Sequence, residues 1–390
     1  MRYYVRKLTD AIRRCDLVLL LLCVVTTVFG LLVIASTTNA SASGPTRYLL
    51  VQAGAAIAGV LAYVLFSSID TETFSEHRLA MVIFNTVALL LLVPFGTDKG
   101  TGNKSWLDFA FLPFDIQPAE ICKITFVLIM ASVMASRQNN ISSPLSIGYI
   151  LGNMILVVGL NLLVSRDMGV SLIFVFVTIG MVWSGGVNIM WFVTAFAGLI
   201  LAAPLAWEFV FSDNQKNRIM VLFDPSLDPQ GTGPMYHTIR ALRSLTGGGL
   251  TGQGLFQGNR TQTRGALFAQ HTDFIFAAIG EELGFIGCTV VLILLIAIIA
   301  RCIWVGNRST DYLRKLVCFG TASALIFQVI VNIGMCIGVM PVIGLTLPFI
   351  SYGGSSLITL YAMLGLVSGV YSRPHATSHE RYIRPPLSHY

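Results

Sequence analysis

Ten long apolar runs, separated by mostly short polar segments, make up the pattern of the chain. A helix that crosses a bilayer needs about 20 apolar residues, with a range of roughly 17 to 25. Each run comes close to this length or exceeds it, so the pattern predicts ten transmembrane helices. The predicted spans cover residues 17–36, 48–69, 79–96, 117–136, 145–165, 168–183, 190–210, 273–303, 315–339 and 347–372.

The segment 211–270, between the seventh and eighth predicted spans, is the longest polar interruption. Connections of this length in compact proteins are usually functional or disordered. Within it Met235, Ile239, Leu242 and Leu245 recur at helical spacing. This spacing predicts a short amphipathic helix that lies on the membrane or against the bundle, and the glycines that follow are expected to end it.

Composition supports a membrane protein. Hydrophobic residues make up 55% of the chain and charged residues 11%, an apolar share that no soluble domain of this size needs. The expected fold class is therefore all-α and polytopic. The formal charge of +6 is modest and argues against nucleic-acid binding. The seven cysteines are scattered and form no Cys-x-x-Cys pair, so we interpret them as packing residues.

Lys and Arg residues near the ends of the spans set the expected orientation. They gather before the first span, around the junction of the eighth and ninth, and after the tenth, whereas the short loops on the other side hold few. Because cytoplasmic loops carry an excess of Lys and Arg, both termini are expected in the cytoplasm. The segments 1–16 and 373–390 then lie inside, and 211–270 is an extracytoplasmic loop of one domain, 17–372.

Asp273 opens the eighth predicted span, directly after the long polar loop. An ionised carboxylate loses several kcal/mol of hydration when it leaves water, so an acid at the mouth of a membrane helix indicates chemistry or transport. At about 3.6 residues per turn, Asp273 shares one face with Ala277, Gly280, Glu281 and Gly284, and that face is expected to meet protein or water. An Asp here can also cap the helix, and the two interpretations are compatible.

Polar residues around the fourth predicted span are further candidates. Glu120 and Lys123 have i, i+3 spacing and can form an ion pair. The pair either fixes this helix in the bundle or belongs to a polar cavity with Asp273. Lys104 and Trp106 precede the span; an interfacial anchor is the simpler interpretation, and a substrate contact is the alternative.

Three arginines, Arg218, Arg240 and Arg243, make the loop 211–270 basic. Guanidinium groups bind phosphate oxygens in pairs, so they suit lipid headgroups or a substrate pyrophosphate equally. The pair Arg166-Asp167, between the fifth and sixth spans, is most simply a solvated turn.

The segment 341–356, between the last two spans, contains two prolines, a glycine pair and several hydroxyl residues, Ser351 and Ser355 among them. It predicts a broken or re-entrant backbone. Such backbone is tolerated at membrane depth only where protein covers it or where it lines a cavity, so the two serines are candidate substrate contacts.

Four stretches, in this order along the chain, resemble the SEDS family of shape, elongation, division and sporulation proteins, with its RodA, FtsW and SpoVE types. The resemblance extends from the first to the tenth span. It is carried by Gln117–Glu120, Phe223–Pro225, His271–Phe276 with Glu281–Gly284, and Leu347–Ser356.

This resemblance implies a ten-helix peptidoglycan glycosyltransferase of the bacterial cytoplasmic membrane. It implies lipid II as the substrate, a class B penicillin-binding protein as the partner, and Asp273 as the essential acid. The chain departs from the family pattern at Lys104–Trp106, Arg166 and Leu267–Gln270. The Lys-Ser-Trp pattern favours the RodA type, whereas other segments favour the division or sporulation type, so the subtype stays open.

Polymerisation requires a sugar hydroxyl of the acceptor to attack the anomeric carbon of a donor whose leaving group is a lipid pyrophosphate. Asp273 is the candidate general base for that hydroxyl, and the change from an α-linked pyrophosphate to a β-linked glycan is one inversion. The leaving group needs positive charge, from Lys123, Arg218, Arg240 or Arg243, or from a divalent cation such as Mg or Mn.

Two other functions fit the same residues. The bundle could act as a lipid II flippase, using its intramembrane carboxylates as a polar path. It could also be a scaffold that recruits cell-wall enzymes, with Glu120, Lys123 and Asp273 in structural roles.

Overall fold

The structure is a computed structural model of the chain. It describes residues 15–39, 44–98, 103–109, 114–209, 211–228, 233 and 235–373. Most of the predicted flanking segments 1–16 and 373–390 lies outside these residues. The described part is mostly helical, and its one sheet is a two-stranded antiparallel hairpin of β1 (Gly96–Thr97) and β2 (Trp106–Leu107).

The apolar runs form helices, as predicted. Nine helical segments of the described chain are long and apolar enough to cross a membrane, and α9 (Met168–Ser184) is a shorter apolar helix of 17 residues. A multi-pass membrane fold is confirmed, and the number of ten spans stays a prediction. The nine are α2 (Leu17–Thr37), α3 (Gly44–Ser68), α5 with α6 (Arg78–Leu90 and Leu92–Phe95), α7 (Pro118–Ser136), α8 (Pro144–Val164), α10 (Ile189–Phe209), α13 (Ile275–Arg308), α14 (Tyr312–Cys336) and α15 (Gly354–Ser372).

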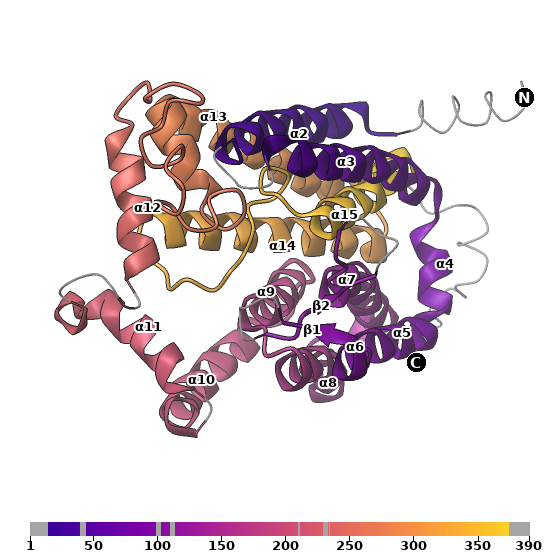
Figure 1. Cartoon of the computed structure of the whole chain (residues 1–390). Helices are drawn as coiled ribbons and strands as arrows, with labels where there is room; N and C mark the ends of the chain where they lie inside the picture. The colour runs from indigo at the N-terminus through magenta and orange to yellow at the C-terminus, as the bar shows by residue number, and fades with distance from the viewer. Residues whose placement is uncertain are drawn as a thin grey trace, which may run out of the picture.

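The helices pack in two groups joined by α14. In one group α2, α3, α13 and α15 lie alongside one another, and in the other α5, α7, α8 and α9 do (Figure 1). Helix α14 packs on α13 and α15 of the first group and on α7 and α9 of the second. Short helices connect the spans: α4 (Thr71–Glu76), η1 (Gln138–Asn140), α11 (Asp213–Phe223), η2 (Pro225–Leu227) and α12 (Tyr236–Gly247).

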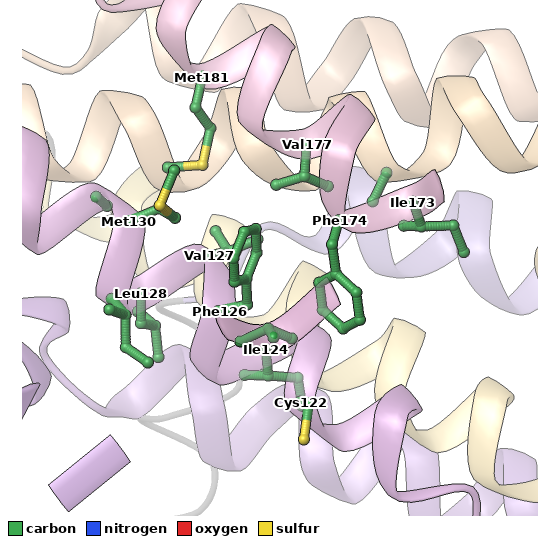
Figure 2. Close-up of a cluster of buried hydrophobic side chains, with 14 of the residues drawn as sticks. Cys122, Ile124, Phe126, Val127, Leu128, Met130, Ile173, Phe174, Val177 and Met181 are labelled. Carbon is green, nitrogen blue, oxygen red and sulfur yellow. The ribbon is translucent and has the colours of Figure 1, made fainter. Parts of the chain in front are cut away.

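Helix α7 lies at the centre of the second group, and most of its residues are buried. Figure 2 shows its side chains against those of α9, with Phe126 facing Phe174. The two rings meet edge to face with their centroids 5.0 Å apart, a favoured geometry for aromatic pairs. Because α7 is enclosed on nearly all sides, the polar residues near its start are buried in protein.

Helix α10 stands apart from both groups. None of its described side chains is buried, and Figure 1 shows it leading into α11 at the edge of the molecule. Helix α11 reaches the bundle through polar contacts. Gln215 donates to the Met168 sulfur at 3.1 Å, and Arg218 donates to the Val342 carbonyl at 3.1 Å.

The predicted amphipathic helix in the loop 211–270 is confirmed as α12. The buried residues are Thr238, Ala241 and Ser244, whereas Leu242 is exposed. Helix α12 packs closely along α13. At this contact Leu245 of α12 lies directly against Gly280 of α13, where an added Cβ would meet the leucine side chain.

The eighth predicted span is confirmed as α13 with two corrections. The helix begins at Ile275, so Asp273 lies before it and does not cap it; the N-cap residue is Phe274, without a side-chain cap. The helix is also interrupted at Gly284, with φ 64° and ψ −162°. A backbone with positive φ suits glycine, and the residues of the glycine-rich loop pair with the break: the Gln253 amide donates to the Glu281 carbonyl at 3.0 Å.

The tenth predicted span is shorter than expected, because α15 begins at Gly354. The residues before it form an irregular segment, with Gly344 at φ 74°, and a turn, as the prediction of a broken backbone required. Phe349 in that turn has φ 65° and is buried, packing edge to face on Tyr361. Strained backbone of this kind persists only where the surroundings hold it in place.

Ion pairs join the helices at the end of the bundle opposite Asp273. Asp16 caps α2 and pairs with Arg301 of α13 at 2.8 Å. Arg314, almost fully buried at the start of α14, pairs with Asp70 at 3.3 Å. Asp311 caps α14 by accepting from the Arg314 amide at 2.9 Å.

Candidate active site

The turn His271–Phe274, just before α13, is held in place through three consecutive backbone carbonyls. The donors come from the segment before α15 and from α14. The Tyr352 amide donates to the His271 carbonyl at 2.8 Å, the Ser351 hydroxyl to Thr272 at 2.7 Å, and the Asn332 side-chain amide to Asp273 at 2.9 Å. The backbone of Asp273 is therefore fixed by two elements distant in sequence.

Asn332 makes a second contact of the same kind. Its side-chain nitrogen also donates to the Leu345 carbonyl at 2.7 Å, and the residue is fully buried in α14. One amide group thus joins the Asp273 turn to the irregular segment Ile343–Leu345 before α15. Sequence analysis missed Asn332, although a polar side chain in the middle of an apolar span is itself a signal of function.

The carboxylate of Asp273 has no hydrogen-bond or ion-pair partner among the described residues, and it is only partly buried. Gly344 lies beside it: a Cβ added there would lie 3.7 Å from Oδ2. Burial, reinforced by the negative charge of Asp167, raises the pKa of Asp273 to about 6. A base whose pKa lies near the working pH is best suited to proton transfer, and an unpartnered carboxylate is free to accept the proton.

Glu120 and Lys123 form the ion pair that their spacing predicted, with Nζ and Oε2 2.8 Å apart and both side chains buried in α7. Neither of these two atoms has a further hydrogen bond among the described residues.

Asp167 was predicted to lie in a solvated turn with Arg166, and the structure corrects this. Arg166 is exposed, with φ 57°, but Asp167 is partly buried and hydrogen-bonded. It caps α9 by accepting from the Val170 amide at 3.1 Å, and it accepts from the Gln117 side chain of α7 at 2.9 Å. Burial raises the pKa of Asp167, as does the charge of Glu120, while the bonds from the α9 amides oppose the rise.

A cavity of about 410 Å³ adjoins the Asp273 turn, where His271 and Thr272 line it. Aromatic rings form much of its wall, together with one basic and one acidic residue. Asp273 is not among the lining residues, but its neighbours in the turn are. The polar and aromatic lining includes Arg47, Tyr48, Trp106, Asp115, His271 and Tyr352.

A second, apolar cavity of about 320 Å³ adjoins the first. It lies along α3, where Leu50, Val51, Gly54 and Ala55 line it, and Phe114 lines both cavities. We call the first one the polar cavity because Arg47, Asp115 and His271 line it among the aromatic rings. Charged groups in one cavity next to an apolar second cavity suit a molecule with a polar head and an apolar tail.

The other predicted site residues do not line the polar cavity. Lys104 is exposed on the hairpin. Arg240 donates to the carbonyls of Gly265 and Ala266 at 2.7 and 2.9 Å, and Arg243 is exposed. Ser351 donates its hydroxyl to the Thr272 carbonyl in the Asp273 turn, and Ser355 is buried at the start of α15. Of the predicted substrate contacts, only Trp106 lines the polar cavity.

The described residues contain no group of three or more His, Cys, Asp or Glu side chains that could hold a metal ion.

Comparison with known proteins gives consistent matches along the chain. The family model for cell cycle proteins of the FtsW, RodA and SpoVE group matches residues 16–375. The chain is 33% identical over 318 residues to the peptidoglycan glycosyltransferase MrdB of Escherichia coli K12, covering 80% of this chain and 83% of that protein. It is 34% identical over 327 residues to the stage V sporulation protein E of Bacillus subtilis, covering 81% and 85%.

Two solved structures have a similar fold. One is a chain from work on the structural coordination of polymerization and crosslinking by a peptidoglycan synthase complex, with a TM-score of 0.75 and 28% identity, covering 92% of this chain and 97% of that one. The other is the rod shape determining protein RodA of Thermus thermophilus, with a TM-score of 0.68 and 26% identity, covering 92% and 97%.

Proposed function

The chain belongs to the FtsW, RodA and SpoVE family of cell cycle proteins, and on this premise we propose that it is a peptidoglycan glycosyltransferase that polymerises lipid II into glycan strands for cell elongation or division. One observation carries the proposal. The carboxylate of Asp273 has no partner of its own, while its backbone is held at three consecutive carbonyls beside a cavity of saccharide size.

In the proposed reaction Asp273 accepts the proton of the acceptor hydroxyl as that oxygen attacks the anomeric carbon of the donor. The bond to the lipid pyrophosphate breaks in the same step, so the configuration inverts and no covalent enzyme intermediate forms. Aromatic walls such as Tyr48 and Trp106 offer flat apolar surfaces to sugar rings, and the apolar cavity on α3 suits a polyprenyl tail.

Arg47 is the cation best placed for the leaving pyrophosphate, because it lines the polar cavity and guanidinium groups bind phosphate oxygens in pairs. Lys123 is held by Glu120, and Arg218 and Arg240 donate to backbone carbonyls. A divalent cation would supply positive charge to the leaving group through the oxygens of the pyrophosphate, as Mg²⁺ commonly does in sites that include substrate phosphates.

We place the protein in the bacterial cytoplasmic membrane, with both termini in the cytoplasm and the Asp273 end outside. The bias of Lys and Arg supports this orientation. The likeness to a chain of a peptidoglycan synthase complex supports a crosslinking partner, for which we propose a class B penicillin-binding protein.

The test is polymerisation of purified lipid II by the purified protein, with and without a class B partner and with a chelator. Glycan strands on a gel support the proposal. Translocation of lipid II in vesicles without any polymer would identify a flippase. The absence of both polymerisation and translocation would favour a scaffold. Loss of polymer with the chelator, restored by Mg²⁺ or Mn²⁺, would establish the need for a divalent cation.

The rate of polymerisation is expected to depend on pH through Asp273. Its raised pKa of about 6 means that the base is protonated and inactive below that pH, and ionised and active above it. The specificity constant kcat/KM for lipid II should therefore rise between about pH 5 and pH 7 and then level off. A rate that is flat across this range would contradict the assignment of the base.

Replacing Asn332 should impair catalysis through the position of Asp273. In Asn332→Leu both carbonyl contacts of the buried amide are lost, and a displacement of about 1 Å can cost roughly a hundredfold in rate. We expect kcat to fall by about 10- to 100-fold with a smaller change in KM. Gln328→Leu is the control, because it removes a buried amide from the same helix without touching the turn; equal losses in both variants would argue against a role in positioning.

A further inference from the structure

Two carboxylates lie on either side of one irregular segment at the Asp273 end of the bundle. The segment is Ile343–Leu345. On one side it packs against the start of α9, where a Cβ added to Gly169 would lie 2.8 Å from the Ile343 carbonyl oxygen. On the other side Gly344 lies beside Oδ2 of Asp273. Asp167, two residues before Gly169, therefore lies across this segment from Asp273.

The two acids are held very differently. Both oxygens of Asp167 accept hydrogen bonds, Oδ1 from the Val170 amide and Oδ2 from Gln117, and its backbone carbonyl accepts from Asn161 at 3.0 Å. Three elements thus fix its position. Asp273 has a fixed backbone but no partner for its carboxylate. The carboxylate of Asp167 is engaged in hydrogen bonds, whereas that of Asp273 is available to accept a proton.

We propose that Asp167 is a positioning residue for polymerisation, an inference that rests on the proposed function. Its fixed negative charge, across Ile343–Leu345 from Asp273, keeps the free carboxylate of Asp273 ready to take a proton from the acceptor sugar. A like charge nearby favours the protonated form of a carboxylic acid and so strengthens the carboxylate as a base. Replacing Asp167 by a neutral residue of the same shape should make Asp273 a weaker base.

The other titratable groups around Asp273 do not supply this charge. On its own turn, burial lowers the pKa of His271, so that ring is neutral at neutral pH. From α14, the thiol of Cys336 lies 4.0 Å from the Asp273 carbonyl. From α7, Glu120 and Lys123 face Asp167 as a paired acid and base. Of these groups, Asp167 is the one whose charge raises the pKa of Asp273.

The decisive variant is Asp167→Asn. Asparagine is as good a helix N-cap as aspartate, so the cap of α9 is retained and only the charge is removed. Asp311→Asn is the matched control, because it changes the N-cap of α14 in the same way at the opposite end of the bundle. Asp167→Ser, which also keeps a capping oxygen, is the second uncharged variant should the asparagine protein fail to fold.

Two readouts are measured against pH on the full-length protein. The first is polymerisation of lipid II. The second is independent of activity: labelling of Asp273 by a hydrophobic carbodiimide, which reacts with the protonated carboxylic acid, quantified by peptide mass spectrometry. In Asp167→Asn both midpoints should move to lower pH by about half a unit or more, and the polymerisation rate at pH 7.5 should fall by about threefold.

Several outcomes would overturn the inference. Midpoints that coincide with the wild type and with Asp311→Asn would show that Asp167 does not influence Asp273. A loss of polymerisation that is equal at every pH, with unchanged labelling, would give Asp167 a structural role only. If Asp167→Asn shifts the labelling midpoint but the wild-type protein does not polymerise lipid II, the proposed function and the catalytic role are refuted. The coupling of the two acids would still stand.

Discussion

Asp273→Asn is expected to abolish the polymerisation of purified lipid II while leaving the melting temperature nearly unchanged. The two side chains have almost the same shape, but an amide cannot take up the proton of the attacking hydroxyl. General-base catalysis typically contributes about 10²- to 10⁴-fold in rate, which is enough to remove detectable polymer. The fold should tolerate the change because the Asp273 carboxylate makes no hydrogen bond among the described residues, and the three bonds that fix the turn involve backbone carbonyls only.

The measurement is the amount and length of glycan strands, with thermal unfolding followed on the same protein preparation. Asp213→Asn, at an exposed position at the start of α11, is the control for a change from acid to amide. Wild-type-like polymer from Asp273→Asn would defeat the assignment. Slow translocation of lipid II by Asp273→Ala, with no polymer from any variant under any condition, would favour the flippase.

The transmembrane architecture could be predicted because it depends on local information. A run of about 20 apolar residues has few alternatives to a membrane helix, and each predicted run contains a helix in the structure. The breaks within and between helices were harder to predict from the sequence. The interruption of α13 at Gly284 depends on pairing with a glycine-rich loop some thirty residues earlier, a contact that no local pattern records.

The site was only partly predictable for the same reason. Asp273 could be found because a single acid at the mouth of an apolar run is conspicuous wherever the chain folds. Asn332 and Asp167 take their roles from neighbours on other helices, so the sequence shows a polar residue within or beside an apolar span but not the groups that it contacts. The arginines show the opposite failure: Arg218 and Arg240 looked available for phosphate, but their guanidinium groups bind backbone carbonyls of the loops they stabilise.

Lys123→Met is expected to destabilise the protein by about 3 to 5 kcal/mol, the typical loss when one partner of a buried ion pair is removed. Methionine fills much of the volume of the lysine stem, so the main consequence is that Glu120, buried in α7, loses its counter-charge at 2.8 Å. The measurement is the free energy of unfolding in mixed detergent micelles.

Two further variants decide whether the unpaired charge of Glu120 causes the loss of stability. Lys104→Met makes the same change at an exposed position and should alter stability by no more than about 0.5 kcal/mol. Adding Glu120→Gln to Lys123→Met removes the unpaired charge and should recover most of the lost stability, because neutral replacements of a buried pair are often tolerated. A double variant as unstable as Lys123→Met alone would show that packing in α7, and not the ion pair, sets the loss.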